Sequence, residues 1–126
     1  MFEQALYEDI NADFTVNGKK YPIYFGEVEQ NAKATYIVQT SLDYGDTPLT
    51  QCRNDYTEFM EFRIYGLDFY AITTIRDALV NYLANLDYVG NYTILKNIKH
   101  TSVVGNDVEN GLPCATAARE FVYTES

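Results

Sequence analysis

The sequence has two cysteines, one histidine and no tryptophan. Two cysteines, Cys52 and Cys114, are too few for a disulfide framework, so we expect both to be thiols. His100 has no second histidine and no nearby cysteine with which to bind a metal. The chain also lacks a glycine-rich phosphate loop after a strand and a G-x-S-x-G turn. The sequence therefore predicts no metal, no cofactor and no enzymatic activity.

Basic residues are also scarce. Nine lysines and arginines face eighteen acidic residues, which gives a net charge of −9 and a pI near 4.4. This balance argues against a protein that reads nucleic acid, because such a protein needs a basic surface to displace counterions from phosphates. No apolar run approaches the roughly 18 residues that a membrane span needs. The first ten residues are acidic and do not form a secretory signal, so we expect the chain to stay in the compartment where it is made.

Aromatic residues are abundant, with twelve tyrosines and seven phenylalanines among 126 residues. Tyrosine is enriched at positions where the ring is buried and the hydroxyl contacts water, and such positions include subunit interfaces. The composition therefore points toward association, while the length predicts one domain over 1–126.

Local patterns predict the elements of the chain. Apolar Phe2, Leu6 and Ile10 fall on one face of a short helix over 2–11. Asn17-Gly18 predicts a type I′ turn between strands. Asp68 is a potential N-cap for a long helix that ends near Asn85. The expected strands lie over 13–16, 20–25, 35–42, 56–65, 91–100 and 114–124, and polar connectors over 43–55 and 103–113. This order predicts an α+β domain with a mainly antiparallel sheet of about four to six strands, with one long and one short helix packed on one face.

The order of elements resembles that of a known family. A short helix precedes "YPIYFGEVEQNAKATYIVQTSLD", a long loop leads into "TEFMEFRIYGLDFYAITTIRDALVNYLANL", and "REFVYTES" closes the chain. This layout, over nearly the whole chain, is similar to that of the tail-completion or tail-terminator proteins of long-tailed bacteriophages. The extra Asn17-Gly18 turn departs from the pattern. The resemblance implies an α+β domain that forms a homohexameric ring without a cofactor or catalysis.

The same resemblance implies the partners and the place of action. Such a ring caps the major tail-tube protein, ends tube polymerisation and meets the connector on the head side, with DNA passing through without specific binding. The protein would then lie in the tail or neck of the virion, and in the host cytoplasm during assembly. A head–tail adaptor or stopper remains open as an alternative within phages. An acidic inhibitor that mimics DNA, or a small ligand-binding domain, remains open as a different class.

Residues 58–66, "EFMEFRIYG", carry apolar groups on both faces of the expected strand. Met60, Phe62 and Ile64 would pack under the long helix. On the other face, two interpretations are open. In the first, the residues of this face contact a neighbouring subunit, and the two charged residues pair across the subunit interface or line the channel of the ring. In the second, the protein is a monomer and the charged side chains cover the two aromatic rings. The residues concerned are Phe59, Glu61, Arg63 and Tyr65.

The connector over 43–55 is long for a loop inside a compact domain, and such loops often bind partners. We expect it to contact the tail tube or the channel, with an ordinary solvated loop as the alternative. The candidate contact residues are Asp43, Tyr44, Asp46, Arg53 and Asp55.

Overall fold

The structure is a computed structural model that describes residues 1–28, 33, 35–45, 55–109 and 112–125. It is an α+β fold in which two helices accompany a six-stranded mixed sheet. The elements in chain order are α1 (Phe2–Asp13), β1 (Ile23–Phe25), β2 (Tyr36–Gly45), β3 (Asp55–Tyr65), α2 (Phe69–Ala84), β4 (Tyr88–Val89), β5 (Tyr92–Glu109) and β6 (Leu112–Glu125).

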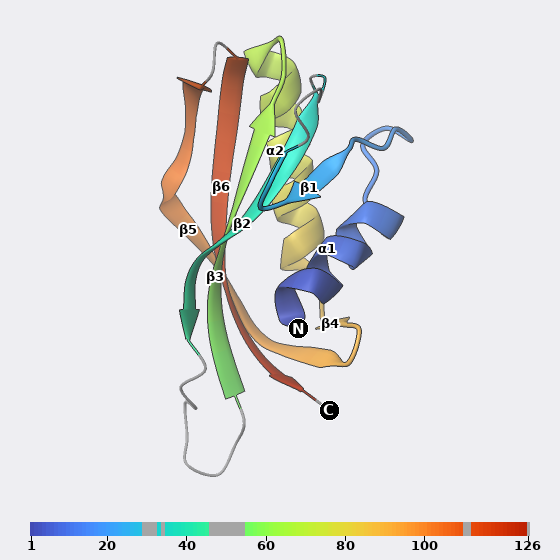
Figure 1. The fold of residues 1–126 in the computed structure, drawn as a ribbon, viewed down its shortest axis with the longest axis vertical. Coiled ribbons are helices and arrows are strands. Elements are labelled where there is room, and N and C mark those ends of the chain that lie inside the picture. The colour runs from blue at the N-terminus through green and yellow to red at the C-terminus, as the bar shows by residue number, and fades with distance from the viewer. Residues whose placement is uncertain (29–32, 34, 46–54, 110–111, 126) are drawn as a thin grey trace.

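The strands follow the order β1-β2-β3-β6-β5-β4 across the sheet. The β1–β2 pair is parallel, whereas the other strand pairs are antiparallel. Both helices lie on the same side of the curled sheet (Figure 1). The α+β class is therefore confirmed; the sheet is mixed because of the single parallel pair β1–β2, and the helices have 12 and 16 residues.

The core lies between the helices and one face of the sheet. Met60, Phe62 and Ile64 of β3 are fully buried there, as the alternation in the sequence predicts. The helices contribute apolar side chains at helical spacing to the same cluster. These residues are Phe2, Leu6 and Ile10 of α1 and Ile72, Ile75, Leu79 and Leu83 of α2.

Helix α2 begins where the sequence predicts. The carboxylate of Asp68 accepts hydrogen bonds from the backbone N–H groups of Tyr70 and Ala71, at 3.4 and 3.3 Å. These bonds satisfy two donors that have no partner within the helix. The helix ends at Ala84, and Asn85 is its C-cap, which also agrees with the prediction.

The Asn17-Gly18 turn is present, but the strand expected over 13–16 is absent, and the strand expected over 20–25 forms only over 23–25, as β1. Asn17 and Gly18 have φ values of +53° and +81°, and Val16 and Lys19 exchange backbone hydrogen bonds at 2.9 and 3.0 Å. The pairing stops at this single bridge. Residues up to 13 belong to α1, and β1 pairs in parallel with β2 instead of returning along 13–16, so the predicted hairpin was wrong.

Two expected connectors are shorter than the sequence predicts. Strand β2 continues through Asp43 and Tyr44 to Gly45, and β3 begins at Asp55, so only 46–54 separates them. Residues 103–109 belong to β5, and 105–109 pair with the start of β6. Backbone hydrogen bonds with a neighbouring strand override the weak preference of such polar residues for loops. Asp46, Cys52 and Arg53 lie outside the described residues.

Strand β5 changes the side to which its residues point. Ile94 pairs with Tyr123 and Lys96 pairs with Val122, so the register shifts at Leu95. An extra residue in one strand reverses the alternation that follows it. Ile94 therefore packs against the core cluster, whereas Lys96 is exposed.

Candidate interaction surface

The face of the sheet opposite the helices carries the predicted interface residues. We call it the outer face and define it by alternate residues of β2, β3 and β6 that pair in register. They are Tyr36, Val38 and Thr40 of β2, Phe59, Glu61, Arg63 and Tyr65 of β3, and Cys114, Thr116 and Ala118 of β6. Phe59, Glu61, Arg63 and Tyr65 thus share one face, as the sequence predicts, and no described helix covers it (Figure 1).

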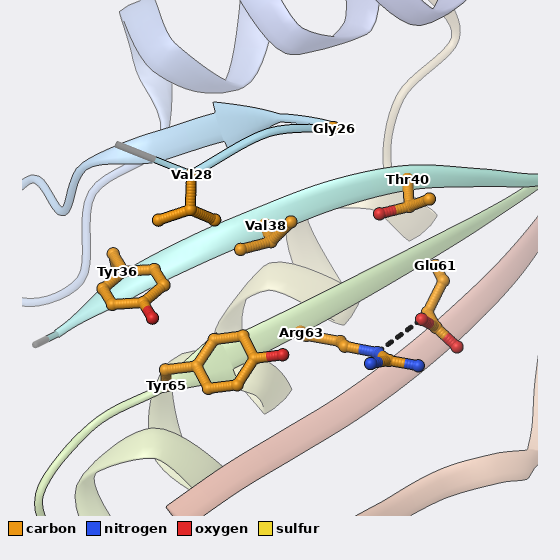
Figure 2. A pocket seen from close by; sticks show the side chains of 8 residues that line it. All are labelled: Gly26, Val28, Tyr36, Val38, Thr40, Glu61, Arg63 and Tyr65. Atoms are coloured by element: carbon orange, nitrogen blue, oxygen red, sulfur yellow. Dashed lines mark hydrogen bonds and ion pairs between the residues drawn. The ribbon is translucent and has the colours of Figure 1, made fainter. Parts of the chain in front are cut away.

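A hollow of about 410 Å³ lies on the β2–β3 part of this face. Figure 2 shows Val28, from the segment after β1, beside the strand residues, with Tyr36 and Tyr65 at one end and the charged pair further along β3. Val38 and Tyr65 are buried although no described helix covers them. Packing among side chains of the outer face itself therefore protects part of its apolar area.

Three tyrosines from three neighbouring strands form the aromatic end of the surface. The rings of Tyr36 and Tyr65 stack with centroids 5.1 Å apart, and Tyr24 of β1 meets Tyr36 edge to face at 5.8 Å. Burial raises the pKa of Tyr36, and the nearby Cys114 and Tyr24 raise it further. The hydroxyl of Tyr36 is therefore neutral at physiological pH and can donate a hydrogen bond.

Cys114 packs with Tyr36 and Tyr65 and is a buried thiol, not half of a disulfide. The expectation of a thiol is confirmed for this residue, whereas Cys52 lies outside the described part of the chain. A buried thiol acts mainly as a small apolar group. Cys114 therefore adds packing to the outer face.

The charged part of the outer face is an ion pair within one chain. Arg63 Nε donates a hydrogen bond to Glu61 Oε1 over 2.6 Å. The Glu61 side chain is only 11% exposed, while the Arg63 side chain is 37% exposed. The two residues stand two positions apart on β3, so their side chains lie on the same face. The pair compensates a carboxylate that would otherwise be nearly buried without a counter-charge.

The second set of predicted residues is only partly placed. Asp43 stands opposite Phe59 in the β2–β3 register, and Tyr44 stands opposite Glu58. Asp55 opens β3 opposite Thr124. These three belong to strands and not to a loop, which corrects the expectation, while Asp46 and Arg53 lie outside the described residues.

Sequence reasoning did not connect Tyr24, Tyr36 and Val38 to the interface strand. Tyr36 and Val38 are two positions apart in β2 and so share a face, but only the register brings that face beside Arg63 and Tyr65. Tyr24 joins them because β1 pairs in parallel with β2. Neither this parallel pairing nor the order of the strands was predicted from the sequence.

No group of three or more metal-binding side chains occurs among the described residues. No described helix is both long and apolar enough to cross a membrane. No protein-family model matches the chain, and a search of curated proteins found no match. The assignment of function therefore depends on the surface itself and on the arrangement of elements.

Proposed function

We propose that this protein is a structural component of a long-tailed bacteriophage that assembles into a ring at the end of the tail tube. The ring ends tube polymerisation and joins the tail to the connector of the head. The proposal combines the resemblance in element order with one structural observation. This observation is the outer face, whose aromatic and ion-paired surface no described helix covers.

The composition of the outer face fits a contact between subunits. Tyrosine, phenylalanine and arginine are enriched in protein interfaces, and stacked aromatic rings provide large contact areas with little loss of side-chain freedom. Tyr36 and Tyr65 are already ordered against each other before any partner binds. The Glu61–Arg63 pair is also formed within the chain, so a partner would bury it without leaving an isolated charge.

The acidity of the chain fits a ring through which DNA passes. Each chain carries a net charge of −9, so the total negative charge of a ring grows with the number of its subunits. Acidic groups that line the channel would repel phosphates and keep the DNA from binding. The segment between β2 and β3 would then contact the tube or the channel.

The first experiment measures the mass of the purified protein by light scattering over a range of concentrations, with negative-stain images of the same samples. A species near six times the mass of 14.4 kDa with an open centre would support the proposal. A protein that is monomeric at every concentration and also fails to bind the ends of purified tail tubes would overturn it.

Binding assays separate the terminator from the adaptor or stopper. A terminator should bind the ends of isolated tail tubes and limit their further growth. An adaptor or stopper should bind the isolated head connector and leave tube growth unchanged. Growth of purified tube protein, with and without the ring, distinguishes the two roles.

Variants test whether the outer face is the contact. Phe59→Ser should abolish the ring while circular dichroism shows an intact fold. Thr40→Glu provides a second variant on the same face, in case loss of the half-buried Phe59 lowers stability. Tyr70→Ser, at an 81% exposed position at the start of α2, is the control and should leave the ring unchanged. Rings that persist in both outer-face variants would exclude this face as the interface.

A further inference from the structure

A pair of acidic residues is buried on the helix side of the sheet, away from the proposed interface. Glu58 of β3 is fully buried, and Glu3 in the first turn of α1 is 8% exposed. Gln39 of β2, also fully buried, donates from Nε2 to the backbone oxygen of Glu3 over 3.0 Å. The carboxyl group of Glu3 also hydrogen-bonds to that of Glu58, so two carboxyl groups meet where α1 rests on the sheet.

The surroundings of this pair contain more hydrogen-bond acceptors than donors. Tyr123 donates its hydroxyl proton to Glu58 Oε1 over 3.1 Å. Among the described residues, no partner satisfies Oε2 of Glu58, Oε2 of Glu3 or Oε1 of Gln39. A buried acceptor without a partner is costly, and an ionised carboxylate can only accept. A protonated carboxyl group would supply a missing donor at this position.

The charges that face Glu58 from each neighbouring element also favour protonation. The surroundings together raise the pKa of Glu58 to about 8: burial is the largest cause, and the charge of Glu3 and a hydrogen bond with its carboxyl group act in the same direction. The hydrogen bond from Tyr123 and the amino group of Met1 act in the opposite direction. On the β6 side, the ring of Tyr123 stacks on Tyr56 of β3, with the centroids 5.7 Å apart.

We propose that Glu58 keeps a proton in the folded protein at neutral pH, beside the carboxyl group of Glu3, and that loss of this proton at alkaline pH separates the first turn of α1 from the sheet. Two adjacent buried carboxylates repel each other, and water must enter to solvate them. Strand β3 is paired along its length with β2 and β6, whereas side-chain contacts such as those of Phe2 and Gln39 hold the first turn of α1 on the sheet, so water would enter at that turn. The carboxyl pair therefore acts as a pH-sensitive contact for the N-terminal helix.

The direction of the pH effect follows from the two states. Unfolded Glu58 has an ordinary pKa near 4.5, and folded Glu58 one near 8, so the folded state holds the proton over this interval. Its contribution to stability is complete below pH 4.5, falls as the pH rises, and is lost above about 8. Within this interval the folding equilibrium constant should fall by up to about tenfold per pH unit because of this group.

The decisive measurement is a ¹³C NMR titration of the side-chain carboxyl carbons in the wild-type chain, together with urea unfolding from pH 5 to 9. A Glu58 midpoint near pH 8 would support the proposal, and a midpoint below 5 would overturn it. This titration requires no variant and so remains decisive if Glu58→Gln does not fold.

Variants then connect the proton to helix α1. Glu58→Gln should remove most of the decline in stability with pH, and should remove the pH-dependent increase in hydrogen exchange in α1. Glu8→Gln, at an exposed position of the same helix, is the matched control and should retain the wild-type profile. Identical pH profiles for Glu58→Gln and wild type would contradict the proposal.

Discussion

The ring of Phe2 stacks on the ring of Tyr123, with centroids 4.0 Å apart and planes 9° from parallel. Phe2 also contacts Phe121 and Tyr92, at 5.4 and 5.6 Å between centroids. A side chain of the first helix is thus held among aromatic residues of the last two strands. This cluster attaches α1 to the sheet directly beside the buried carboxyl pair.

Phe2→Ala should lower the free energy of unfolding by about 3–5 kcal/mol, because it leaves a cavity among three rings. Urea unfolding followed by circular dichroism measures this loss. Phe2→Leu keeps most of the volume and should cost less than about 2 kcal/mol. A loss below about 1 kcal/mol for Phe2→Ala would show that α1 contributes little to the stability of the sheet.

Arg63→Ala should lower the free energy of unfolding by about 1–3 kcal/mol, because the nearly buried carboxylate of Glu61 loses its cation. This loss in the free energy of unfolding is smaller than the loss expected for a fully buried ion pair, because Arg63 is partly exposed to water. Adding Glu61→Gln should restore part of the loss, and a double-mutant cycle in urea measures the coupling. Lys33→Ala, at an exposed site, is the control and should change stability by less than about 0.5 kcal/mol.

Gly66→Ala should be destabilising by about 1–3 kcal/mol, because the space beside Gly66 is already occupied. A Cβ at this position would lie 2.4 Å from Cγ2 of Ile72 and 3.1 Å from the hydroxyl of Thr35. Ile72→Leu removes the β-branch, so the double variant should be less destabilised than the sum of the single variants. Thermal unfolding of the four proteins in this cycle tests the steric explanation, and strictly additive losses would contradict it.

Part of the fold could be predicted from short stretches of sequence. The Asn17-Gly18 turn, the Asp68 cap and the apolar face of α1 depend on residues within a few positions of one another. Their geometry follows from local sterics and hydrogen bonding, which the sequence displays directly. Each of these features is present where the sequence places it.

Other parts depend on partners that are distant in the chain. Strand β5 is longer than its composition indicates, because residues 105–109 pair with β6. The parallel partner of β1 could not be read from the hairpin turn that precedes it, since strand pairing is a tertiary choice. The same limit applies to the candidate surface, where only the register brings Tyr36 beside Tyr65.

The sequence by itself determined the two helices, the apolar face of β3 and the group of Phe59, Glu61, Arg63 and Tyr65, because alternation along one strand is a local property. Only the tertiary structure decided that Glu61 and Arg63 pair within one chain and that Glu3 meets Glu58 in the core. The physical reason is that burial and hydrogen-bond partners arise from the packing of separate elements. A carboxyl group changes its chemistry when packing removes its water, and no short stretch of sequence shows where this occurs.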